Sequence, residues 1–598
     1  MSNLAVVRQR RDSWKDAVAD FREAISCARQ LSYWRGITES GGKLAQAYEH
    51  QGDLTAALAA VNEALEANRH IPDELYFAPR NLAIKAEIEA KLGHRQLAEE
   101  LYKKASDVID GMLANVPTQN IERTLISELA DVYAGNFKLV SDGGDYRKAF
   151  QVIEKARGRI EAQSLAHRSA PIPHGLTAAE RKLNALQLQL LDTDDAKARK
   201  QVLEEIYQTE IQQAGVTPLG LQSQIEPVAV DKLQRELRPD EMLIEYVLDN
   251  TQSYALSITG DSIHRYLLPS KQVLEHEAQT YRRSLHDRKE DLTAAKQLHA
   301  ELLSAIPEYN TKTSVIIIPD GKLHLLPFSS LIDEQGRYAI TTHTICTVPS
   351  GTVLGILRGR ADDGIGSQPY LGVAAWTQTG ERPGFFREIL SGPSRAQLVA
   401  LPESKAEVES IGTILPKPST LLLGETATKE RFENLPLDRY EVLHLALHGY
   451  VDPQFPDRSA LVFAPRSTAA SSDSGFLQVR EILKLHLNAR LVTLSACDTG
   501  VGPVGEEGID NVVEAFIQAG ARTVVSTLWE LEDRSTAHLM KTFYDHLARG
   551  ESKAAALREA QMELARKAVS PYYWASFEVV GDPSGSLYRR SLNYAHTI

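Results

Sequence analysis

Four stretches within the first 165 residues repeat one order of small and large apolar side chains at helical spacing. Each opens on an alanine: Ala17, Ala57, Ala98 and Ala149. Four positions later stand Phe21, Val61, Tyr102 and Ile153, and three further on stand Ala24, Ala64, Ala105 and Ala156. Small residues let a neighbouring helix approach closely, and stacked helix pairs form a solenoid with a concave binding face. The pattern therefore predicts helical repeats over residues 1–165, with a role in binding.

Glycine turns precede three of these stretches, at Gly52-Asp53-Leu54, Gly93-His94-Arg95 and Gly143-Gly144-Asp145. With Tyr48 and Gly52 at the expected first-helix and turn positions, the region resembles the tetratricopeptide repeat. The alanines that open the stretches lie 40, 41 and 51 residues apart, more than the roughly 34 residues of that family. Longer helices would absorb the difference, and a generic helix bundle stays open as the alternative.

Residues 166–225 are expected to be a helical connector or arm. Within them, residues of about 175–215 are charged and rich in Leu and Gln, which predicts one or two amphipathic helices. A solvated helix is favoured there over a coiled-coil partner site.

The composition changes at about residue 226, where short β-rich runs begin to alternate with helical patterns. The predicted strands are Met242–Leu248, Tyr254–Ile258, Val315–Ile318, Tyr370–Ala375, Thr420–Leu423, Val442–Leu447, Leu491–Ser495, Thr523–Thr527 and Phe577–Val580. The predicted helices between them include Glu403–Ile414, Val512–Gln518, Ala537–Ala548 and Ser552–Ala565. This alternation predicts a mostly parallel sheet flanked by helices. The fold class expected for the chain is thus α followed by α/β, with subdomains at 226–368 and 369–598.

Charge and cysteine content exclude several classes of protein. The 598 residues carry a net charge of −13, which disfavours general nucleic-acid binding because phosphate neutralisation needs clustered cations. Three cysteines, Cys27, Cys346 and Cys497, cannot build a disulfide framework. The first residues carry no apolar signal segment, and no apolar run reaches the ~18 residues of a membrane span. We expect a cytoplasmic protein without membrane contact.

Two predicted strand ends carry residues suited to nucleophilic catalysis. One run ends in His448-Gly449, and the other continues as Ser495-Ala496-Cys497-Asp498. Ligands and reacting groups in α/β sheets lie beyond the carboxyl ends of strands. The histidine precedes the cysteine by 49 residues, close to the spacing of about 50 in caspases.

A thiol with its ordinary pKa is mostly protonated at neutral pH, so a nearby imidazole is needed to take up its proton. The same imidazole can then protonate the leaving amine. Gly449 lets the backbone approach a substrate carbonyl, and the amides of Gly449 and Cys497 are candidate oxyanion donors.

Four sequence blocks surround these residues and follow them: HLALHG, SACDTGVGPVGEEGIDNVVEAFIQAGARTVVSTLWELED, HLMKTFYDHLARG and YYWASFEVVGDP. In this order they resemble the CHAT family of caspase-like cysteine peptidases, which are often joined to tetratricopeptide repeats. The resemblance implies a cysteine endopeptidase with a catalytic dyad of His448 and Cys497. It further implies cleavage of a partner protein, in some members as bacterial defence, with the repeats recruiting a regulator. Where many members carry Glu after the cysteine, this chain has Asp498.

The remaining candidates have structural alternatives. Cys27 and Cys346 are expected to be packing residues. His444 is expected to be either a hydrogen-bonded core residue or one that supports the catalytic residues, rather than the base itself. Asp498 is a candidate contact for a basic substrate side chain. Glu506, Glu507 and Asp510 have either that role or a helix-capping one, and Trp529 either lines the cleft or packs at a strand end. We expect neither a metal nor a cofactor. The His444/His448 pair lacks the glutamate of HExxH, and the glycines after Cys497 do not match a phosphate loop.

The competing function is a binding module. The repeats would then recruit a partner, and the caspase-like region would serve as a scaffold or switch without turnover. The Ser-rich stretch 466–475 is a candidate gating or self-cleavage segment.

Overall fold

The computed structural model describes residues 2–3, 6, 13–116, 119–166, 177–191, 193, 195–216, 225–360, 368–376, 401–452, 455–464, 475–495, 504–505, 508–509, 512–531 and 533–587. The described residues up to Ala156 form one compact unit, and those from Arg157 onward form a second. The predicted limits of repeats, connector and α/β region stay predictions.

The first unit consists of helices that pack against one another in chain order. Their bounds are α2 (Trp14–Gln30), α3 (Trp34–His50), α4 (Leu54–Asn68), α5 (Phe77–Lys91), α6 (Arg95–Leu113), α7 (Gln119–Glu128), α8 (Ala130–Asp142) and α9 (Tyr146–Glu154). Each helix from α2 to α5 contacts the next one in the chain, and both α5 and α6 also contact α8. The four repeat alanines Ala17, Ala57, Ala98 and Ala149 are fully buried, as close helix packing requires. The predicted helical repeats are confirmed.

The turns between paired helices use glycine for a backbone reason. Gly52, Gly93 and Gly144 have φ values of +80°, +88° and +81°, a left-handed conformation that strains other residues. Asp53 follows such a turn and caps α4, because its carboxylate accepts a hydrogen bond from the Ala56 amide. Asp145 caps α9 in the same way, through the Lys148 amide.

The second unit is built on one large mixed sheet. Its strands are β1 (Glu241–Val247), β2 (Ser253–Ile258), β3 (Ile263–Leu268), β4 (Ser314–Ile318), β5 (Thr344–Thr347), β6 (Gln368–Ala374), β7 (Ser419–Leu423), β8 (Tyr440–Ala446), β12 (Leu491–Leu494), β15 (Thr523–Thr527) and β16 (Phe577–Gly581). They lie in the order β3-β2-β1-β4-β5-β16-β15-β12-β8-β6-β7. The pairs β1/β2, β2/β3 and β15/β16 are antiparallel, and the other neighbours are parallel. The predicted fold class is confirmed.

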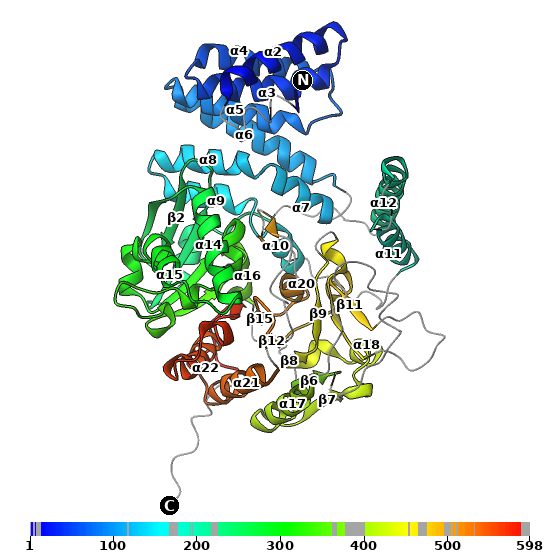
Figure 1. Cartoon of the computed structure of the whole chain (residues 1–598), viewed down its shortest axis with the longest axis vertical. Helices are drawn as coiled ribbons and strands as arrows, with labels where there is room; N and C mark the ends of the chain where they lie inside the picture. Colours follow the sequence, from blue (N-terminus) through cyan, green and yellow to red (C-terminus); the bar gives the residue numbers. More distant parts are fainter. Residues whose placement is uncertain are drawn as a thin grey trace, which may run out of the picture. The chain divides into compact units, whose positions relative to one another are not determined.

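Helices and two small sheets complete the second unit. The helices are α10 (Arg159–Ala166), α11 (Ala178–Leu191), α12 (Ala196–Val216), α13 (Val230–Glu236), α14 (Lys271–His286), α15 (Leu292–His299), α16 (Gly351–Gly359), α17 (Pro402–Ile414), α18 (Lys429–Glu433), α19 (Val479–Ile482), α20 (Val512–Gln518), α21 (Asp533–Ala548) and α22 (Lys553–Arg566). Strands β9 (His448–Tyr450), β10 (Ala460–Val462) and β11 (Phe476–Gln478) form a small antiparallel sheet, and β13 (Val504–Gly505) pairs with β14 (Gly508–Ile509). Figure 1 shows α14, α15 and α16 beside the first strands, and α17 beside β6 and β7.

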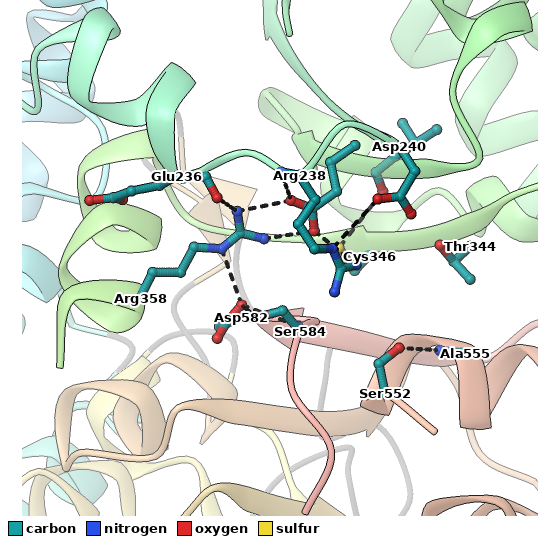
Figure 2. A network of polar contacts seen from close by, with 12 residues as sticks. Glu236, Arg238, Asp240, Thr344, Cys346, Arg358, Ser552, Ala555, Asp582 and Ser584 are labelled. Atoms are coloured by element: carbon teal, nitrogen blue, oxygen red, sulfur yellow. Dashed lines mark hydrogen bonds and ion pairs between the residues drawn. The ribbon is translucent and has the colours of Figure 1, made fainter. Parts of the chain in front are cut away.

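A buried ionic network fastens the middle of the large sheet. Arg358 on α16 donates two hydrogen bonds to the Glu241 carboxylate, at 2.8 and 3.0 Å, and one to Asp582 after β16 at 3.3 Å (Figure 2). The fork of a guanidinium matches a carboxylate in this bidentate geometry. The network therefore links β1 to the end of β16, which lies three strands away in the sheet order.

The two cysteines outside the candidate site differ in environment. Cys346 lies in β5 and is buried, as predicted, and its burial raises the pKa of the thiol well above its ordinary value. The prediction for Cys27 is wrong, because this side chain is exposed on α2. Ile25 and Ala28 face the core, and the helical rotation between them turns Cys27 towards solvent.

Candidate functional site

The carboxyl ends of β6, β8, β12 and β15 lie along one edge of the sheet. These strands are consecutive neighbours in the order β15-β12-β8-β6 and run parallel to one another. Side chains that follow them are therefore delivered to one region, as the general rule for open α/β sheets predicts. His448 follows β8, Trp376 follows β6, and Ser495 follows β12.

His448 is the first residue of β9, and only Leu447 separates it from Ala446 at the end of β8. Its Cα pairs with that of Val462 in β10, and its side chain is buried, with 8% of the residue exposed. The Trp376 ring meets the imidazole edge to face, with 5.6 Å between ring centroids. The Trp376 indole N–H donates to the Val462 carbonyl at 2.8 Å. Trp376 thus contacts His448 and is hydrogen-bonded to β10, the strand that pairs with β9.

The end of β12 is tied to β8 through the backbone. The Ser495 amide donates to the Leu445 carbonyl at 3.2 Å. Cys497 comes two residues later in the chain. Cys497 itself lies outside the described residues, together with the other predicted site residues of this segment, Asp498, Glu506, Glu507 and Asp510. The 466–475 stretch lies outside them as well, except for Gly475. The assignment of these residues stays a prediction.

His444 lies inside β8 and is fully buried. Its Nε2 lies 2.6 Å from Oε1 of Glu407 on α17, and its Nδ1 lies 3.1 Å from the hydroxyl of Tyr544 on α21. Ser495 Oγ lies 3.1 Å from the same Nε2. The prediction that His444 is a hydrogen-bonded core residue is confirmed.

Trp529 follows β15 at the same edge of the sheet. Its side chain is buried, its indole N–H donates to the Tyr572 carbonyl at 3.0 Å, and its ring stacks on Tyr572. These contacts anchor the tryptophan against the segment before β16. A substrate contact for it stays a prediction.

No catalytic sequence motif marks Trp376, Glu407 or Tyr544. Trp376 lies one position beyond the predicted strand Tyr370–Ala375, which pairs with the strand that leads to His448, and this placement is the signal that the sequence offers. Glu407 and Tyr544 lie on predicted helices, where an acid and a tyrosine carry no special pattern. Their meeting at His444 depends on how α17 and α21 cover the sheet, and α17 and α21 pack against each other. Within the described part of the chain, no cluster of three or more His, Cys, Asp or Glu side chains is placed to hold a metal ion.

Comparison with protein-family models matches residues 292–582 to the CHAT domain. The chain carries a CHAT domain. The match begins at α15 and ends just after β16, so it contains β8, β12 and the edge of the sheet described above. Strands β1, β2 and β3 precede it. The CHAT domain thus follows N-terminal helical repeats, as the sequence resemblance implied.

Sequence relatives of the chain are repeat proteins. Tetratricopeptide repeat protein 28 of Mus musculus is 29% identical over 196 residues, which cover 27% of this chain and 8% of the relative. The Homo sapiens protein of the same name is 24% identical over 311 residues, covering 45% and 12%. The chain therefore spans about a tenth of the length of these relatives.

Two solved structures align with large parts of the chain. One is the Saccharomyces cerevisiae separase–securin complex, with a TM-score of 0.36 and 9% identity, covering 92% of this chain and 54% of that one. The other is the Arg-specific cysteine proteinase gingipain R, with a TM-score of 0.34 and 10% identity, covering 59% and 79%. The fold assignment above rests on the sheet order of the chain itself. Among the described residues, none of the helices has both the length and the apolar composition of a membrane span.

Proposed function

We propose that the chain is a caspase-like cysteine endopeptidase that cleaves a partner protein. The observation that carries the proposal is the CHAT match over residues 292–582, within which His448 and the segment leading to Cys497 follow adjacent parallel strands. His448 is the general base, Cys497 the nucleophile, and the amides of Gly449 and Cys497 the oxyanion donors. No metal or cofactor takes part in the proposed reaction.

The proposed reaction divides peptide hydrolysis into two steps. His448 takes the proton of the Cys497 thiol, and the thiolate attacks the carbonyl carbon of the scissile peptide. The two amides stabilise the oxyanion, and one such donor is worth ~2.7–4 kcal/mol in the transition state. Imidazolium then protonates the leaving amine, and a thioester forms. Water, deprotonated by His448, hydrolyses the thioester and releases the acid and the free thiol.

The site is proposed to recognise a basic substrate side chain through Asp498, with Glu507, Asp510 and Trp529 as further contacts. The net charge of −13 supports a basic substrate segment. The role implied by the family resemblance, cleavage of a partner in bacterial defence or cell-death signalling, is part of the proposal.

Labelling with an electrophilic peptidyl probe tests the nucleophile. Because Cys27 is exposed, the experiment is done in a Cys27→Ser background, while Cys346 is buried and protonated. Probe mass on the peptide containing residue 497, lost in Cys497→Ala and reduced in His448→Ala, is the expected result. Equal labelling in the His448→Ala variant contradicts the dyad.

A second function, a repeat scaffold without turnover, is favoured by the relatives, which are named for their repeats. Under this alternative the folded chain binds a partner through its repeats, and Cys497 stays unlabelled with or without that partner. The probe experiment, repeated in a cell extract, therefore distinguishes the two functions.

We further propose that the repeats recruit a regulator that controls the protease. An array of repeats joined to a catalytic region motivates this proposal. A chain that starts at Arg157 keeps every described residue of the second unit. The shortened chain should differ from the full chain in the rate of Cys497 labelling or in the dependence of that rate on a partner. If both quantities are the same in the two chains, the proposal is wrong.

A further inference from the structure

A chain of buried polar groups lies directly beneath the candidate site. It runs through Glu407, His444, Tyr544 and Thr493, with Ser495 as a branch, and these residues come from α17, β8, α21, β12 and the end of β12. Glu407 Oε1 lies 2.6 Å from His444 Nε2, and Tyr544 OH lies 3.1 Å from His444 Nδ1 and 2.7 Å from Thr493 Oγ1. We call these five residues the His444 network.

The hydrogen bonds of the network form one connected set. In one arrangement that makes all of them, His444 donates Nε2–H to Oε1 of Glu407 and accepts at Nδ1 from the Tyr544 hydroxyl. Tyr544 in turn accepts from the Thr493 hydroxyl. Ser495 Oγ stands 3.1 Å from Nε2 and shares that side of the imidazole with the carboxylate.

Packing alone does not require this arrangement. Glu407, His444 and Thr493 are almost fully buried, and burying polar groups is costly unless all their hydrogen bonds are made. The neighbouring positions Ala374, Val408 and Ala446 form an apolar cluster, so apolar side chains fill adjacent space in the same layer. A buried polar network stabilises the fold less than apolar packing would, but when all its hydrogen bonds are made it holds its side chains in one geometry.

The geometry that it fixes is the spacing of two strand ends. Thr493 and His444 are register partners in β12 and β8, and Ser495 contacts β8 twice, through its amide to Leu445 and its hydroxyl to His444. His448 lies four residues beyond His444, and Cys497 lies two residues beyond Ser495. We infer that Glu407, His444 and Tyr544 are positioning residues that fix the end of β12, which leads to Cys497, against β8, which leads to His448. The inference rests on the proposed dyad.

The test is the pH dependence of Cys497 alkylation by iodoacetamide, measured in the Cys27→Ser chain. The His448→Ala variant provides the profile of a thiol without its base. The inference predicts that Glu407→Gln and Tyr544→Phe shift the wild-type profile towards the His448→Ala profile and slow alkylation at neutral pH about tenfold. The matched control is Tyr246→Phe, which removes another buried hydroxyl, bonded to the Leu302 carbonyl at 2.7 Å. The control should keep the wild-type profile.

Thermal denaturation of each variant shows that the measured protein is folded. Wild-type profiles in both folded network variants, with a shifted profile in His448→Ala, overturn the inference and leave the protease proposal standing. If the His448→Ala variant has the wild-type pH profile of Cys497 alkylation, the dyad is wrong and the inference falls with it. A shift in Tyr246→Phe as large as that in Tyr544→Phe assigns the effect to general loosening of the core and also overturns the inference.

Discussion

At the scale of single residues, the candidate base depends on one aromatic neighbour. Trp376 contacts the His448 ring edge to face and is itself held by the Val462 carbonyl. Trp376→Leu removes both interactions, and we expect kcat to fall about tenfold while KM changes little, because a small displacement of a catalytic group is costly. Steady-state kinetics on a cleaved peptide measures this. A Trp376→Leu enzyme with wild-type kcat contradicts the role.

Lys553 is a buried cation whose charge opposes folding. Desolvation lowers the pKa of its ammonium from 10.5 to about 8, and the attraction of the Asp582 carboxylate offsets only part of this effect. The unfolded chain binds this proton more tightly, so stability should rise as the pH increases from about 8 to 10.5. Lys553→Met should stabilise the protein on the order of 2 kcal/mol at pH 7.

Urea denaturation at pH 7 and at pH 10 checks the Lys553 prediction. The gain from Lys553→Met should shrink at the higher pH, because the wild-type lysine is neutral there in the folded state. A gain of the same size at both values contradicts this account of the charge.

The sequence predicts the roles of residues that follow strands. It does not predict contacts between residues of a helix and a strand that pack against each other. His448 was assigned from its place before Gly449 at a strand end, and His444 from its place inside the strand. The prediction for Cys27 is wrong because helical phase turns its side chain outward, whereas a free cysteine taken alone favours a packing role. Glu407 and Tyr544 were missed because their contact with His444 arises from tertiary packing.

At the scale of elements, the start of the second unit is set by a buried ion pair cluster. Arg157 lies 3.1 Å from Glu245 and 2.7 Å from Asp320, and all three side chains are at least nine-tenths buried. Removing the cation leaves two carboxylates buried without it, which costs about 3–5 kcal/mol. A deletion of residues 1–165 should therefore unfold at lower temperature than a deletion of residues 1–156. Calorimetry of the two chains measures the difference, and equal melting temperatures contradict it.

The helical arm α11–α12 packs against the segment that precedes β10. Leu183, Leu186, Leu190, Val202 and Ile206 form its own core, with Phe455 packed against it. Burial, together with the charge of Asp457, raises the pKa of Glu210 on α12 from 4.5 to about 7. A raised carboxyl pKa contributes stability at low pH that is lost as the pH rises towards 7 and beyond.

We therefore expect α12 to exchange its amide protons faster at pH 8 than at pH 6, after correction for the intrinsic exchange rate. Glu210→Gln should remove most of this difference, because an amide carries no charge at either pH. Hydrogen exchange read by mass spectrometry measures both proteins. The same pH effect in wild type and variant contradicts the assignment to Glu210.

All nine strands expected from β-rich runs are present, with ends that differ by at most two residues, as for Val442–Leu447 against β8 (Tyr440–Ala446). Buried parallel strands are apolar on both faces, which makes them conspicuous in a sequence. The short strands β9, β10 and β11 carry no such run. They were not foreseen, although β9 holds His448.

At the scale of the whole molecule, the chain joins a helical repeat unit to an α/β unit whose CHAT domain carries the candidate dyad. The order of the two units was predictable because the repeat spacing and the strand–helix alternation are local patterns. The link through Arg358 between β1 and the end of β16 was not, because its partners Glu241 and Asp582 lie far apart in the sequence.

The most direct test of the central claim is a comparison of new protein N-termini in cells that express the full chain or its Cys497→Ala variant at equal levels. We predict a small set of peptides, cleaved after a shared residue type, that appears with the wild-type chain and is absent with the variant. An identical set of N-termini from both chains would contradict the claim that Cys497 cleaves a partner protein.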